Sequence, residues 1–87
     1  MFVLMAYDAS SKRVGRILRT ARRYLNWVQN SVLDGEITAG ALKALKRELG
    51  EIIDPEHDSV LFYVWAEGRY TSRGCLGVQR EARANFV

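Results

Sequence analysis

The chain has 87 residues, 48% of them hydrophobic, and a formal net charge of +3. This length and composition exclude a disordered chain and indicate one small domain with one core, residues 1–87. A single cysteine and a single histidine exclude an internal disulfide framework and argue against a zinc site. No apolar run approaches the roughly 18 residues of a membrane helix, and the opening run lacks the basic segment of a signal peptide, so we expect a cytoplasmic protein with no membrane partner.

The opening residues predict a strand followed by a helix. Residues 2–7 (FVLMAY) are a nearly continuous apolar run, typical of a strand covered on both faces, and Asp8 follows them. Ser10 or Ser11 is a suitable N-terminal cap for the helix, which should end near residue 25 or 26. Its apolar positions recur at helical spacing: Val14, Ile17, Leu18, Ala21 and Leu25.

The basic charge of the chain is concentrated in this helix. Residues 12–23 carry six basic side chains and no acidic one, so the other residues sum to −3. Ordinary solvated faces mix both signs of charge, whereas this one predicts phosphate binding with little base readout. The candidate nucleic-acid-binding residues are Lys12, Arg13, Arg16, Arg19, Arg22 and Arg23.

The middle of the chain predicts further strands and a second helix. Residues 27–33 are interpreted as two short strands or one bent strand, and Asp34-Gly35 is a turn signal. Thr38 is a good cap for the second helix, which Pro55 ends. The apolar stripe of this helix comprises Leu42, Leu45, Leu49 and Ile52.

The last third predicts one strong strand and a weak one. Residues 60–65 (VLFYVW) are the strongest strand signal, residues 67–74 read as a polar loop, and residues 75–78 read as a last short strand. The order predicts an α+β, ferredoxin-like β-α-β-β-α-β domain with a short extra C-terminal strand and both helices on one face. Because the strands are apolar on both faces, we expect a homodimer packed sheet to sheet.

Four segments in this order and spacing carry a resemblance to a known family. They are Tyr7-Asp8, the arginine-rich helix, VQNSV at 28–32, and IIDP at 52–55 with the DS and FY pairs that follow it. On these segments the chain, from residue 1 to about residue 65, resembles the CRISPR-associated Cas-two family, the small subunit of the spacer-acquisition machinery. Two positions depart from the pattern: Trp27 stands where members usually have arginine, and Leu33 where they often have phenylalanine.

The resemblance implies both a function and a site. It implies a homodimer that binds double-stranded DNA across its basic helices and bridges the integrase subunit during CRISPR adaptation. It also implies a metal-dependent endonuclease that cuts DNA or RNA, single-stranded RNA included, with Asp8 as the catalytic and metal-binding residue. One carboxylate is a poor magnesium site, so two Asp8 side chains, one from each chain, would hold Mg²⁺ or Mn²⁺. Trp27 in place of the family's arginine would remove a phosphate contact and thereby counts against nuclease activity.

Other interpretations stay open from the sequence. Asp8 alone reads as an ordinary strand-end aspartate, and the basic helix reads as a solvated face. The aromatic residues of 60–65 favour a core or dimer interface over base stacking. The alternative function is a small ferredoxin-like regulatory or protein-binding subunit with no nuclease activity.

Overall fold

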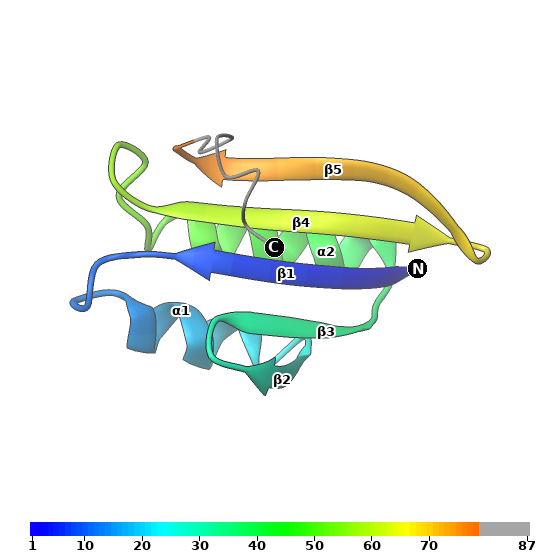
Figure 1. Cartoon of the computed structure of the whole chain (residues 1–87), viewed down its shortest axis with the longest axis horizontal. Helices are drawn as coiled ribbons and strands as arrows, with labels where there is room; N and C mark the ends of the chain where they lie inside the picture. The colour runs from blue at the N-terminus through cyan, green and yellow to red at the C-terminus, as the bar shows by residue number, and fades with distance from the viewer. Residues whose placement is uncertain (79–87) are drawn as a thin grey trace.

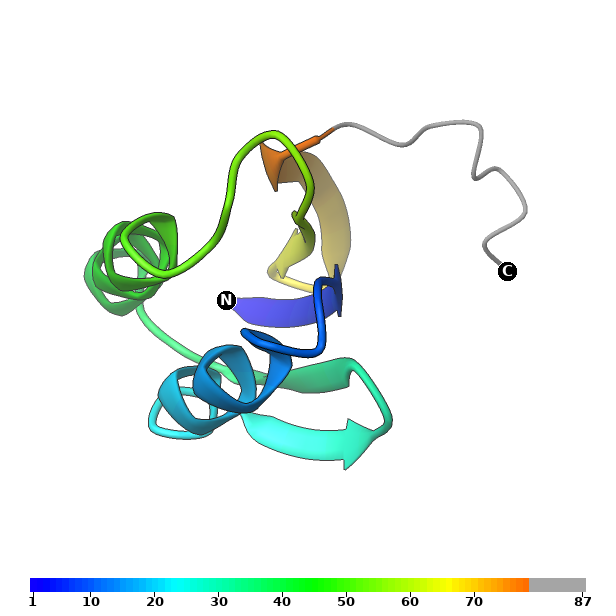
Figure 2. The same ribbon diagram turned by 90° about the vertical axis from the view of Figure 1, so that its left-hand side faces the viewer.

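The computed structural model describes residues 1–78 and contains a five-stranded sheet in the order β2-β3-β1-β4-β5 (Figure 1). Every neighbouring pair of strands is antiparallel. Both helices lie on the same side of the sheet (Figure 2), as the ferredoxin-like prediction requires. The elements are β1 (Phe2–Asp8), α1 (Val14–Ala21), β2 (Asn26–Gln29), β3 (Val32–Glu36), α2 (Ala39–Gly50), β4 (Ser59–Ala66) and β5 (Arg69–Gly77).

The core lies between the sheet and the two helices. Alternate residues of β1, beginning with Val3 and Met5, are buried against the helices, because successive side chains of a strand point to opposite faces. The predicted cap of α2 is confirmed, because the Thr38 hydroxyl oxygen accepts a hydrogen bond from the Ala41 N–H at 3.0 Å. Three of the four predicted stripe residues, Leu42, Leu45 and Leu49, are buried in the helix, whereas Ile52 lies beyond its end at Gly50, which comes earlier than Pro55. Neither helix of residues 1–78 has the length and apolarity needed to span a bilayer.

Helix α1 is shorter than its apolar stripe predicts. The prediction that Ser10 or Ser11 caps this helix is wrong. Arg13 occupies the N-cap position without a side-chain hydrogen bond. The Ser10 hydroxyl oxygen accepts a hydrogen bond from the Lys12 N–H at 3.1 Å instead. The helix ends at Ala21 because the chain tightens there into a turn, in which the Tyr24 and Leu25 N–H groups both donate to the Ala21 carbonyl. Buried Leu25 then leads directly into β2.

The turn that joins β2 and β3 lies earlier in the chain than predicted. Residues 27–33 do form two short strands, but Asp34 and Gly35 lie inside β3, where they pair with Leu4 and Val3 of β1. The connection between β2 and β3 falls at Asn30, which has a φ of +45°. Asparagine tolerates this left-handed conformation better than most residues, and the asparagine therefore supplies the turn.

The predicted loop over residues 67–74 is wrong after its first two residues. Strand β5 begins at Arg69 and pairs with β4 over its length, for example Tyr70 with Trp65 and Cys75 with Leu61. As an edge strand it exposes most of its side chains, so its sequence is polar and lacks an apolar alternation. The extra C-terminal strand is confirmed, and it is longer than expected.

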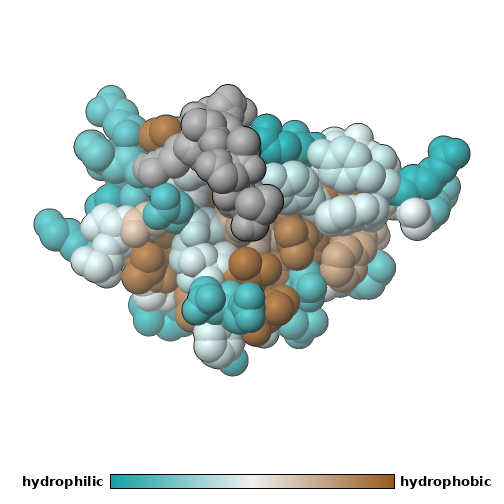
Figure 3. Space-filling view, in the orientation of Figure 1, coloured by the Kyte–Doolittle hydropathy of each residue, from teal (hydrophilic) through white to brown (hydrophobic). Residues whose placement is uncertain are grey.

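The helix-free face of the sheet is apolar, as predicted from the two-faced strands. Phe2, Leu4 and Ala6 of β1 lie on it, opposite the side chains that point to the helices. Cross-strand neighbours on β4 extend the patch, with the Phe2 and Trp65 ring centroids 5.9 Å apart. Figure 3 views this face and shows hydrophobic residues gathered over the middle of the sheet. The homodimer that would cover the face stays a prediction.

Candidate nucleic-acid interface and candidate metal residue

Three of the predicted cationic residues form one exposed row along the start of α1. Arg16 and Arg19 are exposed and three residues apart, which places them on one side of α1, and exposed Lys12 lies in the turn just before the helix. The first turn of α1 carries no acidic residue. Within residues 1–78, no carboxylate forms an ion pair with any of the three. Their charge is therefore available to an external anion.

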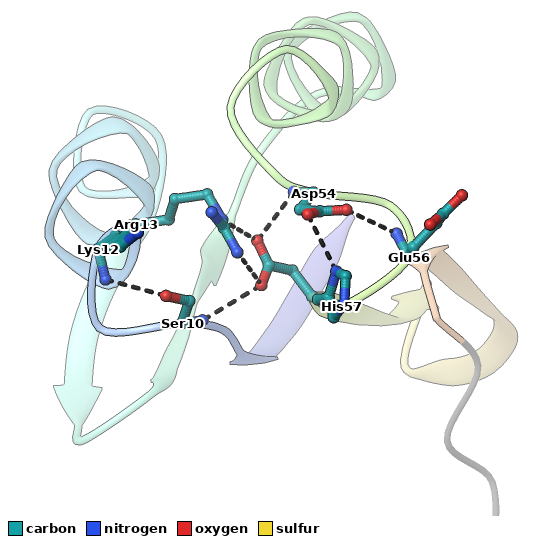
Figure 4. Close-up of polar contacts among 7 residues, drawn as sticks. Ser10, Lys12, Arg13, Asp54, Glu56 and His57 are labelled. Carbon is teal, nitrogen blue, oxygen red and sulfur yellow. Dashed lines mark hydrogen bonds and ion pairs between the residues drawn. The ribbon is translucent and has the colours of Figure 1, made fainter.

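Arg13 has a partner inside the protein. Its guanidinium donates two hydrogen bonds to the Asp58 carboxylate, from Nε to Oδ2 at 2.5 Å and from an Nη nitrogen to Oδ1 at 3.1 Å (Figure 4). The Asp58 carboxylate also accepts from the backbone N–H groups of Ser10, at 3.2 Å, and Asp54, at 2.9 Å. The Asp58 side chain is fully buried and that of Arg13 is 24% exposed. A nucleic-acid role for Arg13 stays a prediction, but its charge is already offset.

These contacts strongly favour the ionised carboxylate. Hydrogen bonding by Arg13 is the largest cause, and it outweighs burial, so the pKa of Asp58 falls from 3.8 to about 2. The same contacts hold the pKa of the Arg13 guanidinium above its ordinary value. Asp58 thereby ties the loop before α1 to the loop before β4. The next residue, Ser59, pairs with Asp8 in the sheet, so this cluster also supports the end of β1.

Arg23 is likewise engaged with a carboxylate. It forms an ion pair with Glu48 of α2, and Glu48 also accepts a hydrogen bond from the Tyr24 hydroxyl. These hydrogen bonds, that of Tyr24 first, lower the pKa of Glu48, and the carboxylate raises the pKa of Tyr24. Arg23 and Glu48 thus join the end of α1 to α2. Two of the predicted phosphate-binding arginines, Arg13 and Arg23, therefore pair with carboxylates inside the protein. The positive charge that the helix presents to solvent is smaller than the sequence indicates.

Arg22 follows the last residue of α1 and lies beside an exposed aromatic ring. Its guanidinium carbon is 5.9 Å from the centroid of the Trp27 ring. An open depression of about 410 Å³ is lined by Gly15, Leu18, Arg19 and Arg22. The exposed face of α1 therefore combines cations that pair with no carboxylate of residues 1–78 with a shallow hollow and a neighbouring indole.

Asp8 lies on the opposite side of the sheet from α1. It ends β1, is exposed, and belongs to the alternate positions of β1 that do not pack against the helices. Across residues 1–78, no group of three His, Cys, Asp or Glu side chains gathers closely enough to hold a metal ion. One copy of the chain therefore supplies a single carboxylate from Asp8, which by itself does not complete a magnesium site.

Asp58 is the residue of this region that sequence reasoning missed as a site residue. In the sequence, Asp58 stands out only as part of the Asp58-Ser59 pair among the family segments. Charge patterning along the chain does not indicate that Asp58 meets Arg13. Trp27 departs from the family pattern in the sequence, but its place beside Arg22 depends on how β2 packs beside α1.

The fold and these residues define a class: a small ferredoxin-like α+β domain with a cationic helix on one side of its sheet and an exposed strand-end carboxylate on the other. The family model described as CRISPR associated protein Cas2 matches residues 1–73 of the chain. The chain belongs to this family.

Similar proteins agree with this assignment. A protein of Dictyoglomus turgidum named CRISPR-associated endoribonuclease Cas2 is 47% identical over 87 residues, covering 100% of both chains. One of Thermotoga maritima with the same name is 48% identical over 80 residues, 92% of each chain. Among solved structures, Streptococcus pyogenes Cas2 at pH 6.5 has a TM-score of 0.70 at 32% identity, covering 77% of this chain and 88% of that one.

Proposed function

We propose that the chain is a spacer-acquisition subunit that binds double-stranded DNA through α1 and bridges the integrase subunit. The observation that carries the proposal is the exposed row of Lys12, Arg16 and Arg19, which no carboxylate of residues 1–78 neutralises. Cations on one face of a helix and in the turn before it suit the phosphates of a duplex, whose binding needs no base contact. Membership of the Cas2 family supports the same function.

A homodimer is part of this proposal. The helix-free face carries half-buried apolar side chains on β1 and β4, and a second copy packed on it would remove their remaining surface from water. A two-fold dimer formed in this way leaves both α1 helices on the outside, where each carries its own cationic row. Sedimentation at micromolar concentration tests it, and a stable monomer would contradict it.

The duplex-binding proposal is tested by removing two cations from the row. Arg16→Ala with Arg19→Ala should weaken binding to all duplex sequences alike and reduce the slope of log affinity against log salt by about 2, since each phosphate contact contributes about 0.9. The matched control is Lys43→Ala with Arg47→Ala, which removes the same charge from the exposed side of α2. Equal weakening by the two double variants would indicate a response to net charge alone and would contradict a binding role for α1.

The bridging role has its own measurement. The parent and the Arg16/Arg19 double variant should both co-sediment with the integrase subunit when DNA is absent, because the cationic row is assigned to DNA. A parent protein that sediments separately from the integrase would contradict bridging. It would leave the duplex-binding result unchanged.

A metal-dependent endoribonuclease is the second candidate function. Two observations favour it: Asp8 is exposed on the face through which the dimer is proposed to form, and the relatives described above are named endoribonucleases. Two Asp8 carboxylates near a two-fold axis fit the preference of Mg²⁺ or Mn²⁺ for oxygen ligands. A metal ion bound there would activate water and offset phosphate charge. In this candidate Asp8 acts only as a ligand, and the α1 cations hold the nucleic acid.

Asp8→Asn separates the two candidates. The variant should lose cleavage of single-stranded RNA and of DNA in the presence of Mg²⁺ or Mn²⁺, while its nucleic-acid affinity stays near that of the parent. Glu56→Gln, at an exposed loop carboxylate, is the matched control and should retain activity. Equal cleavage by the parent and Asp8→Asn would reject Asp8 as the catalytic ligand, and absence of cleavage in both would leave only the binding function.

A further inference from the structure

Trp27 is an exposed aromatic side chain that is held in place beside the cationic helix. It is 49% exposed, in a strand whose four residues are all exposed. Its indole Nε1 donates a hydrogen bond to the Asn30 carbonyl oxygen at 2.9 Å, across the β2–β3 connection. This bond limits rotation of the ring. Much of the ring surface is therefore open to solvent while its orientation is already set.

The surroundings of Trp27 are cationic. Arg22 lies 5.9 Å from the ring centroid, and the same arginine lines the depression of about 410 Å³ with Arg19, Gly15 and Leu18. This volume lies within the usual range of small-ligand sites, about 300–1,000 Å³. A Cβ atom built on Gly15 would meet nothing within 4 Å, so the depression is open at that residue.

We propose that Trp27, Arg22 and the neighbouring depression form a stacking subsite for an unpaired nucleotide. The base stacks on the indole, and its phosphate lies between Arg22 and Arg19. This proposal rests on the proposed nucleic-acid binding by α1 and deepens it: the preferred ligand carries a single-stranded segment. Because every base has a π-face, stacking on Trp27 tolerates all sequences.

The alternative occupant of this edge is a protein. Strand β2 is an edge strand, and Trp27 and Val28 expose apolar surface on it. Two observations favour a nucleotide. The residues flanking the ring and the depression are arginines, and residues 12–23 contain no acidic side chain. Phosphate next to a stacked base satisfies both the cations and the ring, whereas an apolar protein surface would leave the guanidinium charges without a partner.

The two tryptophans of the chain provide a direct test. Trp65→Phe leaves Trp27 as the only fluorescent indole, and Trp27→Phe leaves Trp65, which packs against Phe2 and Tyr70 away from α1, as the matched control. Each variant is titrated with a short oligothymidylate and with an abasic strand of the same length. Stacking predicts that oligothymidylate quenches Trp27, that the abasic strand does not, and that Trp65 responds to neither.

Affinity provides the second readout. Trp27→Ala should bind oligothymidylate at least about fivefold more weakly than the parent, the lower bound for losing one stacked base, and should bind blunt duplex with unchanged affinity. Trp27→Phe keeps an aromatic ring and should retain most of the affinity, which separates stacking from loss of fold.

Three results would overturn the subsite. Oligothymidylate that binds without changing Trp27 emission would reject stacking while duplex binding by α1 stands. A Trp27 emission that follows protein concentration alone would assign this edge to a protein contact. Failure of the parent to bind either single strand or duplex would reject the subsite together with the proposed function.

Discussion

Replacing Asp58 by asparagine is expected to destabilise the fold by about 2 kcal/mol near neutral pH. The carboxylate is fully buried, and its pKa is held at about 2 instead of 3.8, chiefly by the hydrogen bonds from Arg13. The difference between the two values corresponds to about 2 kcal/mol of preference for the ionised form. Because the Arg13 side chain is 24% exposed, solvent screening makes this figure an upper value.

The pH dependence has a definite sign. The pKa of Asp58 is lower in the folded protein than its ordinary value of 3.8, so its contribution to stability is complete above about pH 4. The contribution falls as the pH drops, is about half its full size near pH 3, and is lost as the pH passes below the folded pKa of about 2. Asparagine does not titrate, so the difference in unfolding free energy between parent and variant should shrink over the same range.

Urea unfolding followed by circular dichroism measures this difference at pH 7, 4 and 3. The protein concentration is held constant, because association contributes to the apparent stability of a dimer. Glu56→Gln, at an exposed carboxylate, is the control and should stay within about 0.5 kcal/mol of the parent at each pH. The reasoning is refuted if Asp58→Asn also stays within that margin at pH 7, or if its deficit is as large at pH 3 as at pH 7.

Three further substitutions test the packing and backbone. Thr38→Ala should cost about 1 kcal/mol in thermal unfolding, because it removes the hydroxyl that accepts from the Ala41 N–H; no change would contradict the cap. Leu45→Ala should cost about 2–5 kcal/mol in urea unfolding, since the side chain is fully buried; a cost below about 1 kcal/mol would contradict a tight core. Gly77→Ala should raise amide hydrogen exchange in β5, because its Cβ would lie 2.1 Å from the Asp58 carbonyl oxygen at a φ of +81°; unchanged exchange would contradict this clash.

Elements with strong local patterns were predictable from the sequence. The apolar run before Asp8, the strand around residues 60–65, and the cap and leucine stripe of the second helix all appear where expected. Their signals depend on periodicity and on residues close together in the chain, which is why they can be read without a structure. The family resemblance also depended on local segments, and the match of the family model to residues 1–73 confirms it.

The sequence by itself determined the fold class, the concentration of positive charge in residues 12–23 and the apolar character of both sheet faces. Only the tertiary structure decided which of those charges remain available. Arg13 meets Asp58, 45 positions away in the chain, and Arg23 meets Glu48, 25 positions away. The full length of β5 and the surroundings of Trp27 were also decided by the tertiary structure, because edge-strand pairing and side-chain packing join segments that no short-range pattern connects.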